Sequence, residues 1–251
     1  MAAGFKDHFS SASDAYAAFR PDYPDALYAW LAGQCGARAA AWDCATGNGQ
    51  AARGLAAHFG RIVATDASAE QIRHAQPHPG VDYRVASAEA SGLATASVDL
   101  VTVAQAAHWF DLPRFYAEAR RVLKPAGILA VWGYGRLVLP DPLDAPYLDF
   151  YARTLGPYWP AERALVEDGY RGLPFPFPPV QAPAFAIRVE WNLPRLIAYL
   201  STWSAVKRYQ AARGHDPLPD LQARLTPAWG EPMTARALAW PLFLRAGRSA
   251  A

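Results

Sequence analysis

Two aspartates and two glycines are the residues whose types and spacing best suit chemistry. Asp43 ends an apolar stretch, which then opens through Gly47 and Gly49 into a helical pattern. Glycine at such a turn lets the backbone approach a ligand closely. Asp66 lies nineteen positions beyond Gly47 and closes a second apolar stretch, where a carboxylate can accept hydrogen bonds from both hydroxyls of a ribose. The spacing predicts a site for a cofactor that contains adenosine.

Other interpretations of these residues remain open. Gly47, Gly49 and Ala52 also match the dinucleotide-binding motif in its alanine-ended form, which would suit an NAD(P)-dependent oxidoreductase. A tight strand-to-helix turn without a ligand would use the same glycines, and Asp66 could cap the helix that follows it. Cofactor binding is favoured because Asp43 and Asp66 both lie at the distances that it needs.

A parallel sheet would position these side chains. From residue 39 short apolar runs alternate with helical patterns, which is typical of βαβ units. The expected strands are residues 40–43, 61–66, 81–86, 98–103 and 127–133, and the expected crossover helices are residues 50–59, 68–75 and 112–123. Two helices, residues 10–20 and 25–32, are expected ahead of the sheet.

The pattern changes after residue 135. Residues 135–183 are rich in proline and aromatic residues and lack the βαβ rhythm, so they are interpreted as a cap insertion with helical patches at 143–155 and 162–168. The rhythm resumes with a strand at 185–191, a helix at 194–212 and a final strand at 235–245. Pro241 cannot donate a ladder hydrogen bond, which predicts a bulge or an exposed edge in that strand.

Composition narrows the classes of protein. Hydrophobic residues make up 52% and charged residues 18% of the 251 residues, which favours a packed, enzyme-like body. A net charge of +2 leaves no cation excess for a nucleic-acid partner. The two cysteines lack metal-ligand spacing, so no metal site or disulfide framework is expected. We expect a cytoplasmic monomer or homodimer with no membrane segment.

Several segments together resemble class I S-adenosylmethionine (AdoMet)-dependent methyltransferases of the small-molecule type, in particular the trans-aconitate methyltransferase-like group. Asp43 before the glycine loop is similar to the family's acidic-x-Gly-x-Gly-x-Gly motif. Residues 86–89 resemble the family's Gly-Asp-Ala-Glu loop beside the adenine. Residues 98–110 and 121–127 are similar to the family's stretch from the fourth strand to the fifth strand. Residues 16–24 resemble its Tyr-x-x-Phe-Arg-Pro-x-Tyr-Pro segment. Ala45 and Ser87 depart from the glycine and aspartate that many members carry.

The resemblance implies a fold and a cofactor site. The fold is α/β, a Rossmann-like, doubly wound seven-stranded sheet with an antiparallel last strand and a helical cap insertion. One domain spans residues 1–251, with N-terminal helices at 1–36, an AdoMet-binding core at 37–134, the cap at 135–183 and the C-terminal part of the sheet at 184–251. The expected AdoMet contacts are Tyr16, Arg20, Asp43, Ala45, Gly47, Gly49, Gln50, Asp66, Ala67, Ser87, Ala88, Glu89, Ala104 and Gln105.

The acceptor side is expected at the carboxyl end of the fourth strand, which His108 and Trp109 follow. His108 is the candidate general base because its ordinary pKa lies near 6.5, although a lone histidine is more often structural. Trp109, Trp132, Tyr134 and Trp203 are candidates for the pocket wall, and such aromatic residues also serve simply as core.

The predicted reaction is methyl transfer to a small-molecule acceptor by in-line displacement, in which the protein mainly aligns the two reactants. A carboxylate or another oxygen nucleophile is the expected acceptor, and a carboxylate needs no base because it is already ionised at neutral pH. An NAD(P)-dependent oxidoreductase and a non-catalytic AdoMet-binding module are the alternatives. No convincing Tyr/Lys pair for hydride transfer supports the first.

Overall fold

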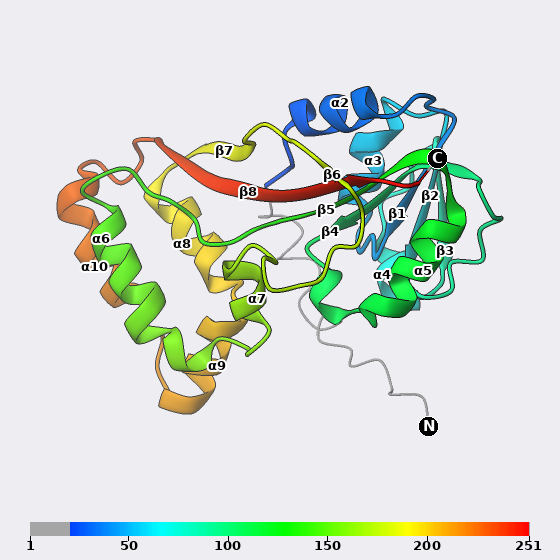
Figure 1. Ribbon diagram of the computed structural model, residues 1–251. Coiled ribbons are helices and arrows are strands. Elements are labelled where there is room, and N and C mark those ends of the chain that lie inside the picture. Colours follow the sequence, from blue (N-terminus) through cyan, green and yellow to red (C-terminus); the bar gives the residue numbers. More distant parts are fainter. Residues whose placement is uncertain (1–20, 251) are drawn as a thin grey trace.

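The computed structural model describes residues 21–250, so the predicted helix at 10–20, with Tyr16 and Arg20, lies outside the described residues. Within them the strands follow the order β3-β2-β1-β4-β5-β8-β6, and β7 pairs with β8 (Figure 1). Strands β1 to β5 are parallel to one another, and β8 is antiparallel to β5. Their bounds are β1 Ala40–Cys44, β2 Arg61–Asp66, β3 Val81–Val85, β4 Val98–Ala104, β5 Leu123–Tyr134, β6 Pro179–Val180, β7 Ala186–Trp191 and β8 Arg236–Arg248.

The predicted fold class is confirmed, with one more strand than expected. The additional strand, β6, has two residues and pairs with the end of β8. Strand β5 also begins earlier than predicted, and its register with β4 shifts between Val98 and Leu100. The remaining parallel strands lie within a residue or two of their expected bounds.

Successive residues of the central strands point to opposite faces of the sheet. On one face Ala41, Leu100 and Ile128 pack with the two helices α2 and α3. On the other face Trp42, Val101 and Leu129 pack with α5. Helices on both faces explain why these strands are apolar throughout, as buried parallel strands are. The helices of this core are α2 Asp25–Gln34, α3 Gln50–Ala56, α4 Ala69–His74, the 3-10 helix η1 Ala107–Trp109 and α5 Leu112–Val122.

Strand β8 joins the core to a helical lobe (Figure 1). Its second half pairs with β5, from Leu242 to Arg248, and its first half pairs with β7, from Arg236 to Pro241. Pro241 lies where the pairing changes from β7 to β5, and it pairs with Ala186 without a register shift, so the predicted bulge is not formed there.

The lobe contains helices from two stretches of the chain. The predicted insertion at 135–183 holds α6 and α7, and the same lobe also contains α8 to α10, which follow β7 (Figure 1). The elements are α6 Asp144–Asp149, the π-helix η2 Phe150–Thr154, the 3-10 helix η3 Gly156–Tyr158, α7 Arg163–Glu167, α8 Leu193–Ser201, α9 Ser204–Arg213 and α10 Leu218–Trp229. None of the helices within residues 21–250 is long and apolar enough to cross a membrane.

The single helix predicted at 194–212 is wrong, because the chain breaks between α8 and α9. Trp203 is extended, with φ −69° and ψ 135°. Its ring lies 5.2 Å from that of Trp159 and 5.8 Å from that of Tyr151, measured between centroids. Tertiary packing of this side chain outweighs the helical pattern around it.

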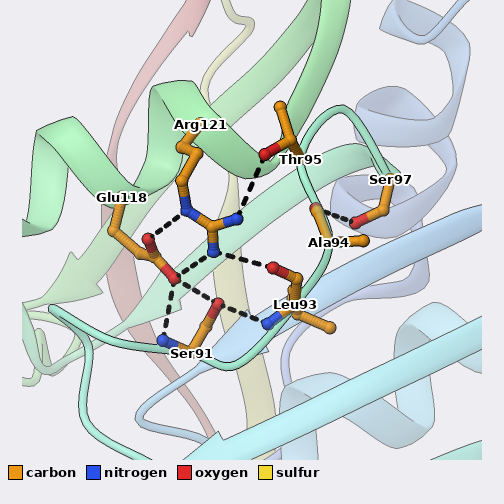
Figure 2. Close-up of polar contacts among 7 residues, drawn as sticks. All are labelled: Ser91, Leu93, Ala94, Thr95, Ser97, Glu118 and Arg121. Atoms are coloured by element: carbon orange, nitrogen blue, oxygen red, sulfur yellow. Dashed lines mark hydrogen bonds and ion pairs between the residues drawn. The ribbon is translucent and has the colours of Figure 1, made fainter.

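A buried carboxylate fixes the loop between β3 and β4 to α5 (Figure 2). Glu118 accepts hydrogen bonds from the backbone amide of Ser91 at 2.8 Å and from its hydroxyl at 2.5 Å. Arg121 donates to both oxygens of Glu118 at 2.7 Å and to the carbonyl of Leu93 at 2.7 Å. Hydrogen bonds from Arg121 and Ser91 lower the pKa of Glu118 from its ordinary 4.5 to about 2, against the effect of burial.

This network predicts a pH-dependent contribution to stability. Because the pKa is lower in the folded protein, the contribution is present above pH 4.5 and is lost as the pH falls towards about 2. We expect Glu118→Gln to lower the free energy of unfolding by about 1–3 kcal/mol at pH 7, since Arg121 faces solvent and screening limits the attraction. Urea unfolding at pH 7 and pH 3 measures this difference.

The control variant is Glu190→Gln, which changes an exposed glutamate of β7. It should match the wild type at both pH values. If Glu118→Gln lowered the free energy of unfolding by the same amount at pH 7 and at pH 3, the result would contradict the role of the ionised carboxylate.

Candidate functional site

The glycine loop joins β1 to α3 and is held from below by Asp43. Asp43 is completely buried and accepts hydrogen bonds from the hydroxyls of Thr46, at 2.6 Å, and Thr102, at 2.8 Å. Burial raises its pKa to about 6, although these hydrogen bonds act in the opposite direction. The carboxylate therefore ties the loop to the neighbouring strand β4 and is not itself at the surface of the site.

Asp66, at the end of β2, fixes the upper side of the same loop. Its Oδ2 accepts a hydrogen bond from the amide of Gly47 and its Oδ1 one from the amide of Ser68, both at 2.9 Å. Ser68, not Asp66, caps α4, because its hydroxyl accepts from the amide of Gln71. A carboxylate can accept about four hydrogen bonds in all, so its bonds to these two amides do not by themselves prevent it from accepting bonds from a ribose.

The backbone of the loop needs glycine at two positions, for different reasons. Gly47 has φ +55°, and among the described residues a Cβ there would have only Gln71 Oε1 within 4 Å, at 3.9 Å. Gly49 has φ +82°, and a Cβ there would lie 2.2 Å from the hydroxyl of Tyr83. Gly47 thus leaves space above the loop, and Gly49 allows the loop to pack against β3. Ala45 takes φ +54° without being glycine, a conformation that costs an L-residue about 1–2 kcal/mol.

The predicted adenine loop is attached to α5 through a side chain. Glu89 accepts a hydrogen bond from the amide of Asp111, at the start of α5. Ser87 forms an isolated bridge with Ala90, and Ala88 between them is buried. Glu89 and, through Ser91, the Glu118 network thus fix the C-terminal end of this loop to α5. Ala67 follows Asp66 and is exposed.

The remaining predicted cofactor residues hold neighbouring backbone. Gln50 donates from its side-chain amide to the carbonyl of Pro21 and to the carboxylate of Asp22, both at 2.8 Å. Gln105, with φ +60°, donates to the carbonyl of Tyr134 at 3.0 Å. Ala104 is the last residue of β4 and is half-buried. These contacts fix the carboxyl ends of β4 and β5 and the chain that enters α2.

His108 is paired with a tyrosine that follows α7. The His108 Nδ1 lies 2.6 Å from the hydroxyl of Tyr170, and the His108 ring contacts that of Trp109 at a centroid distance of 4.6 Å and a tilt of 45°. Burial lowers the pKa of His108 to about 4 and raises the pKa of Tyr170. Both groups are therefore uncharged at neutral pH, and the phenol can donate to Nδ1.

The predicted wall residues are distributed over three places. Trp109 is 39% exposed beside His108. Trp132 is fully buried, with its ring edge-on to that of Tyr23 at 5.6 Å, and its indole nitrogen has no partner among the described residues. Tyr134 lies beside Tyr23 at the end of β5. Trp203 belongs to the lobe, as do Trp159 and Tyr209, so the aromatic residues do not form one wall.

Two partners in the site were missed from the sequence. Thr102 lies directly opposite Asp43 in the register of β1 and β4, so the strand order of a doubly wound sheet could have identified it. Tyr170 lies 62 residues from His108, and no local pattern connects them. Within the described part of the chain, no group of three or more His, Cys, Asp or Glu side chains could hold a metal ion.

Comparisons with known proteins agree with this arrangement. The sequence model of a methyltransferase domain matches residues 42–131. A Dictyostelium discoideum protein named as a methyltransferase is 36% identical over 229 residues, 90% of this chain and 87% of its own. A solved structure from Anaeromyxobacter dehalogenans, named as a type II methyltransferase, has a TM-score of 0.89 and 46% identity, covering 92% of this chain and 98% of its own. One from Bacillus halodurans, with a TM-score of 0.50 and 19% identity over 90% of this chain and 99% of its own, shares the fold alone.

The doubly wound sheet places the loop between Asp43 and Asp66 at the carboxyl ends of parallel strands, which is where sheets of this kind bind their ligands. The match to the methyltransferase domain and the two similar proteins that align over most of their length identify the family. The chain belongs to the class I S-adenosylmethionine-dependent methyltransferases. This membership excludes the NAD(P)-dependent oxidoreductase that the glycine motif had left open.

Proposed function

We propose that the protein transfers the methyl group of AdoMet to an oxygen nucleophile of a small-molecule acceptor, and that a carboxylate is the favoured nucleophile. The observation that carries the cofactor assignment is Asp66, whose carboxylate is oriented by the amides of Gly47 and Ser68 beside the open space above Gly47. This donor and acceptor set suits a ribose and the amino-acid end of AdoMet. The likeness to the trans-aconitate group stays a prediction.

The residues of the chain would divide the work between cofactor and acceptor. Asp66 would accept the ribose hydroxyls, the loop of Ser87 to Glu89 would flank the adenine, and Asp43 would hold the glycine loop in place from below. AdoMet supplies the electrophilic methyl group when it is bound. The protein's contribution is then to align the acceptor oxygen with that carbon and to exclude water.

The environment of His108 favours an acceptor that needs no base. A general base is most effective when its pKa is near the working pH, and burial lowers that of His108 to about 4. An imidazole of such low basicity is poorly suited to remove a proton from an alcohol or an amine. A carboxylate is already ionised at neutral pH, so it requires only orientation.

This interpretation predicts a flat pH profile for the transfer step. With an acid acceptor, we expect kcat to change less than about threefold between pH 6 and 8, because neither the acceptor nor His108 titrates there. His108→Phe should keep kcat within about tenfold of the wild type, since the ring is expected to pack rather than to transfer a proton. An inflection near pH 6.5 that disappears in His108→Phe would contradict both expectations.

Calorimetric titration with AdoMet, S-adenosylhomocysteine (AdoHcy) and NADPH tests the proposal as a whole. We expect saturable binding of the first two and none of the third, followed by transfer of a labelled methyl group to a panel of carboxylic acids. Tight AdoMet binding with no transfer to any carboxylate, phenol or alcohol would instead support a non-catalytic AdoMet-binding module. Absence of AdoMet binding would overturn the proposal.

A further inference from the structure

Strand β3 is an open edge of the sheet. It stands at one end of the strand order and pairs with β2, and within residues 21–250 no strand pairs with its other side, which faces away from the lobe (Figure 1). An edge strand presents backbone N–H and C=O groups to which a further strand can bind. The residues of β3 therefore determine what this edge can pair with.

The hydrogen bonds at the two ends of β3 show which of its backbone groups face outwards. The amide of Ile62, in β2, donates to the carbonyl of Gly80 at 3.0 Å. At the other end, the amide of Ala86 donates to the carbonyl of Asp66, also at 3.0 Å. Even-numbered residues therefore face β2, because the N–H and C=O groups of successive residues in a strand point to opposite sides. The backbone groups of the odd-numbered residues face the open edge.

The sequence of β3 is complementary to itself when two copies run antiparallel. The strand reads Val81-Asp82-Tyr83-Arg84-Val85. About a two-fold axis through Tyr83, Asp82 lies opposite Arg84 of the second copy, and Val81 lies opposite Val85. Opposite charges directly across two strands attract each other, and apolar side chains in such pairs pack together. A dimer with two-fold symmetry needs a self-complementary surface of this kind.

The outward-facing backbone groups suit the same arrangement. In an antiparallel pair, opposite residues alternate between pairs that exchange both backbone hydrogen bonds and pairs that exchange none. The odd-numbered residues would form the bonded pairs, so the amide of Tyr83 would donate to the carbonyl of Tyr83 in the second copy. The amide of Val85 would donate to the carbonyl of Val81, whose own amide is already bonded to the carbonyl of His78 at 3.0 Å. Backbone and side chains thus favour one register.

The charged residues would occupy the non-bonded pairs, in which side chains lie closest. Oδ2 of Asp82 accepts hydrogen bonds from Nη2 of Arg61 and Nη2 of Arg84, both at 2.6 Å. Within residues 21–250 its Oδ1 accepts none, so it can accept one from Arg84 of the second copy. The side chains of Asp82 and Arg84 are 37% and 39% exposed and can be reached. Like charges along an edge would repel a second strand, whereas these alternate in sign.

Val85 supplies the apolar part of this edge. It is 56% exposed, which makes it one of the few large apolar side chains at the described surface. Val81 is half-buried against the core at the other end of the strand. In the antiparallel pair, Val85 of each copy would cover Val81 of the other. Removing this apolar area from water favours association.

We propose that two copies of this protein associate through antiparallel pairing of their β3 strands about Tyr83, which joins the two sheets into one across a two-fold axis. Each strand contributes five residues, and Arg61 leaves the charged cluster with a positive excess. The dimer should therefore be weak, with a dissociation constant on the order of 1–100 µM. The proposal does not depend on the methyl transfer proposed above. The alternative is that the charges of β3 only protect the edge of a monomer.

Sedimentation equilibrium of the full chain between about 1 and 500 µM tests the proposal with two charge reversals. Asp82→Arg and Arg84→Asp each place like charges opposite one another in a homodimer, so each should weaken self-association by about tenfold or more. An equimolar mixture of the two variants restores opposite charges in both pairs. We expect the mixture to form a heterodimer with a dissociation constant within about threefold of the wild-type value.

Two further variants separate the interface from charge and from folding. Glu190→Arg makes the same change of charge on an exposed residue of β7, and it should leave the dissociation constant of the dimer unchanged. Val85→Lys changes a side chain that is already exposed, so the fold should tolerate it, but it should weaken the dimer by about tenfold. Melting temperatures identify any charge variant that does not fold, in which case Val85→Lys gives the result.

Several results would overturn the proposal. The wild type could remain monomeric at every concentration, which would leave the charges of β3 with the protective role alone. Folded Asp82→Arg, Arg84→Asp or Val85→Lys could self-associate as tightly as the wild type, which would place any interface elsewhere. The mixture of the two charge variants could fail to associate, which would contradict the register about Tyr83.

Discussion

Asp66→Ala is expected to weaken AdoMet binding by about 1–3 kcal/mol, or about 5- to 150-fold, because the variant removes the hydrogen bonds proposed to the ribose. The expectation follows from the position of the carboxylate, which is held at 2.9 Å by the amides of both Gly47 and Ser68. Calorimetric titration with AdoMet measures the change. Asp82→Ala serves as the matched control, since Asp82 lies on the adjacent strand β3 and pairs with Arg61 and Arg84.

The same variant also removes acceptors from the glycine loop, so the ligand must distinguish the two effects. We expect the 2′,3′-dideoxy analogue of AdoHcy to bind wild type and Asp66→Ala with similar affinity, because it lacks the hydroxyls that Asp66 is proposed to accept. AdoHcy itself should lose affinity in the variant. Equal losses for both ligands would show that Asp66 acts only through the loop.

The two loop glycines are expected to respond differently to the same substitution. Gly49→Ala should lower the free energy of unfolding by about 2–4 kcal/mol, since the new Cβ would lie 2.2 Å from the hydroxyl of Tyr83 at a left-handed φ of +82°. Gly47→Ala meets no such contact among residues 21–250, so the strain of the left-handed φ alone should lower the free energy of unfolding by about 1–2 kcal/mol. Its Cβ would instead occupy the space above the loop and weaken AdoMet binding by about tenfold or more.

Urea unfolding and AdoMet titration of both variants check this contrast, and Tyr83 provides the internal control. In a Tyr83→Ala background the contact with residue 49 is absent, so Gly49→Ala should then cost about 1–2 kcal/mol, the strain alone. If Gly49→Ala lowered the free energy of unfolding by as much in that background as in the wild type, the destabilisation would not arise from the contact with Tyr83. A Gly47→Ala protein that is stable and binds AdoMet normally would remove the loop from the proposed site.

The sequence allowed the turn between β1 and α3 and its closeness to the end of β2 to be predicted because the signals for them are local. The glycine turn and the aspartate at the end of the next strand recur at a fixed spacing, and parallel strands bring their carboxyl ends to one edge. Gly47 and Asp66 accordingly meet in the structure. The contact between Thr102 and Asp43 depends on which strand lies beside β1. The strand order contains that information, and the sequence around Asp43 does not.

The lobe was less predictable because its contacts join residues that are distant along the chain. Trp203 interrupts a continuous helical pattern only because rings from α6, η2 and the segment after η3 surround it. Trp132 was an equally plausible wall or core residue, since a strand covered on both faces is apolar throughout. It lies in the core with no exposed surface.

Strand β8 constrains how this molecule can move. Two bodies joined by a short linker swing about a few backbone dihedrals, but here the connection is a thirteen-residue strand that is hydrogen-bonded to β5 over one half and to β7 over the other. The strand resists bending between the core and the lobe, because each half is held by its own ladder of hydrogen bonds. Relative movement of the core and the lobe would therefore have to break hydrogen bonds of one of these two ladders.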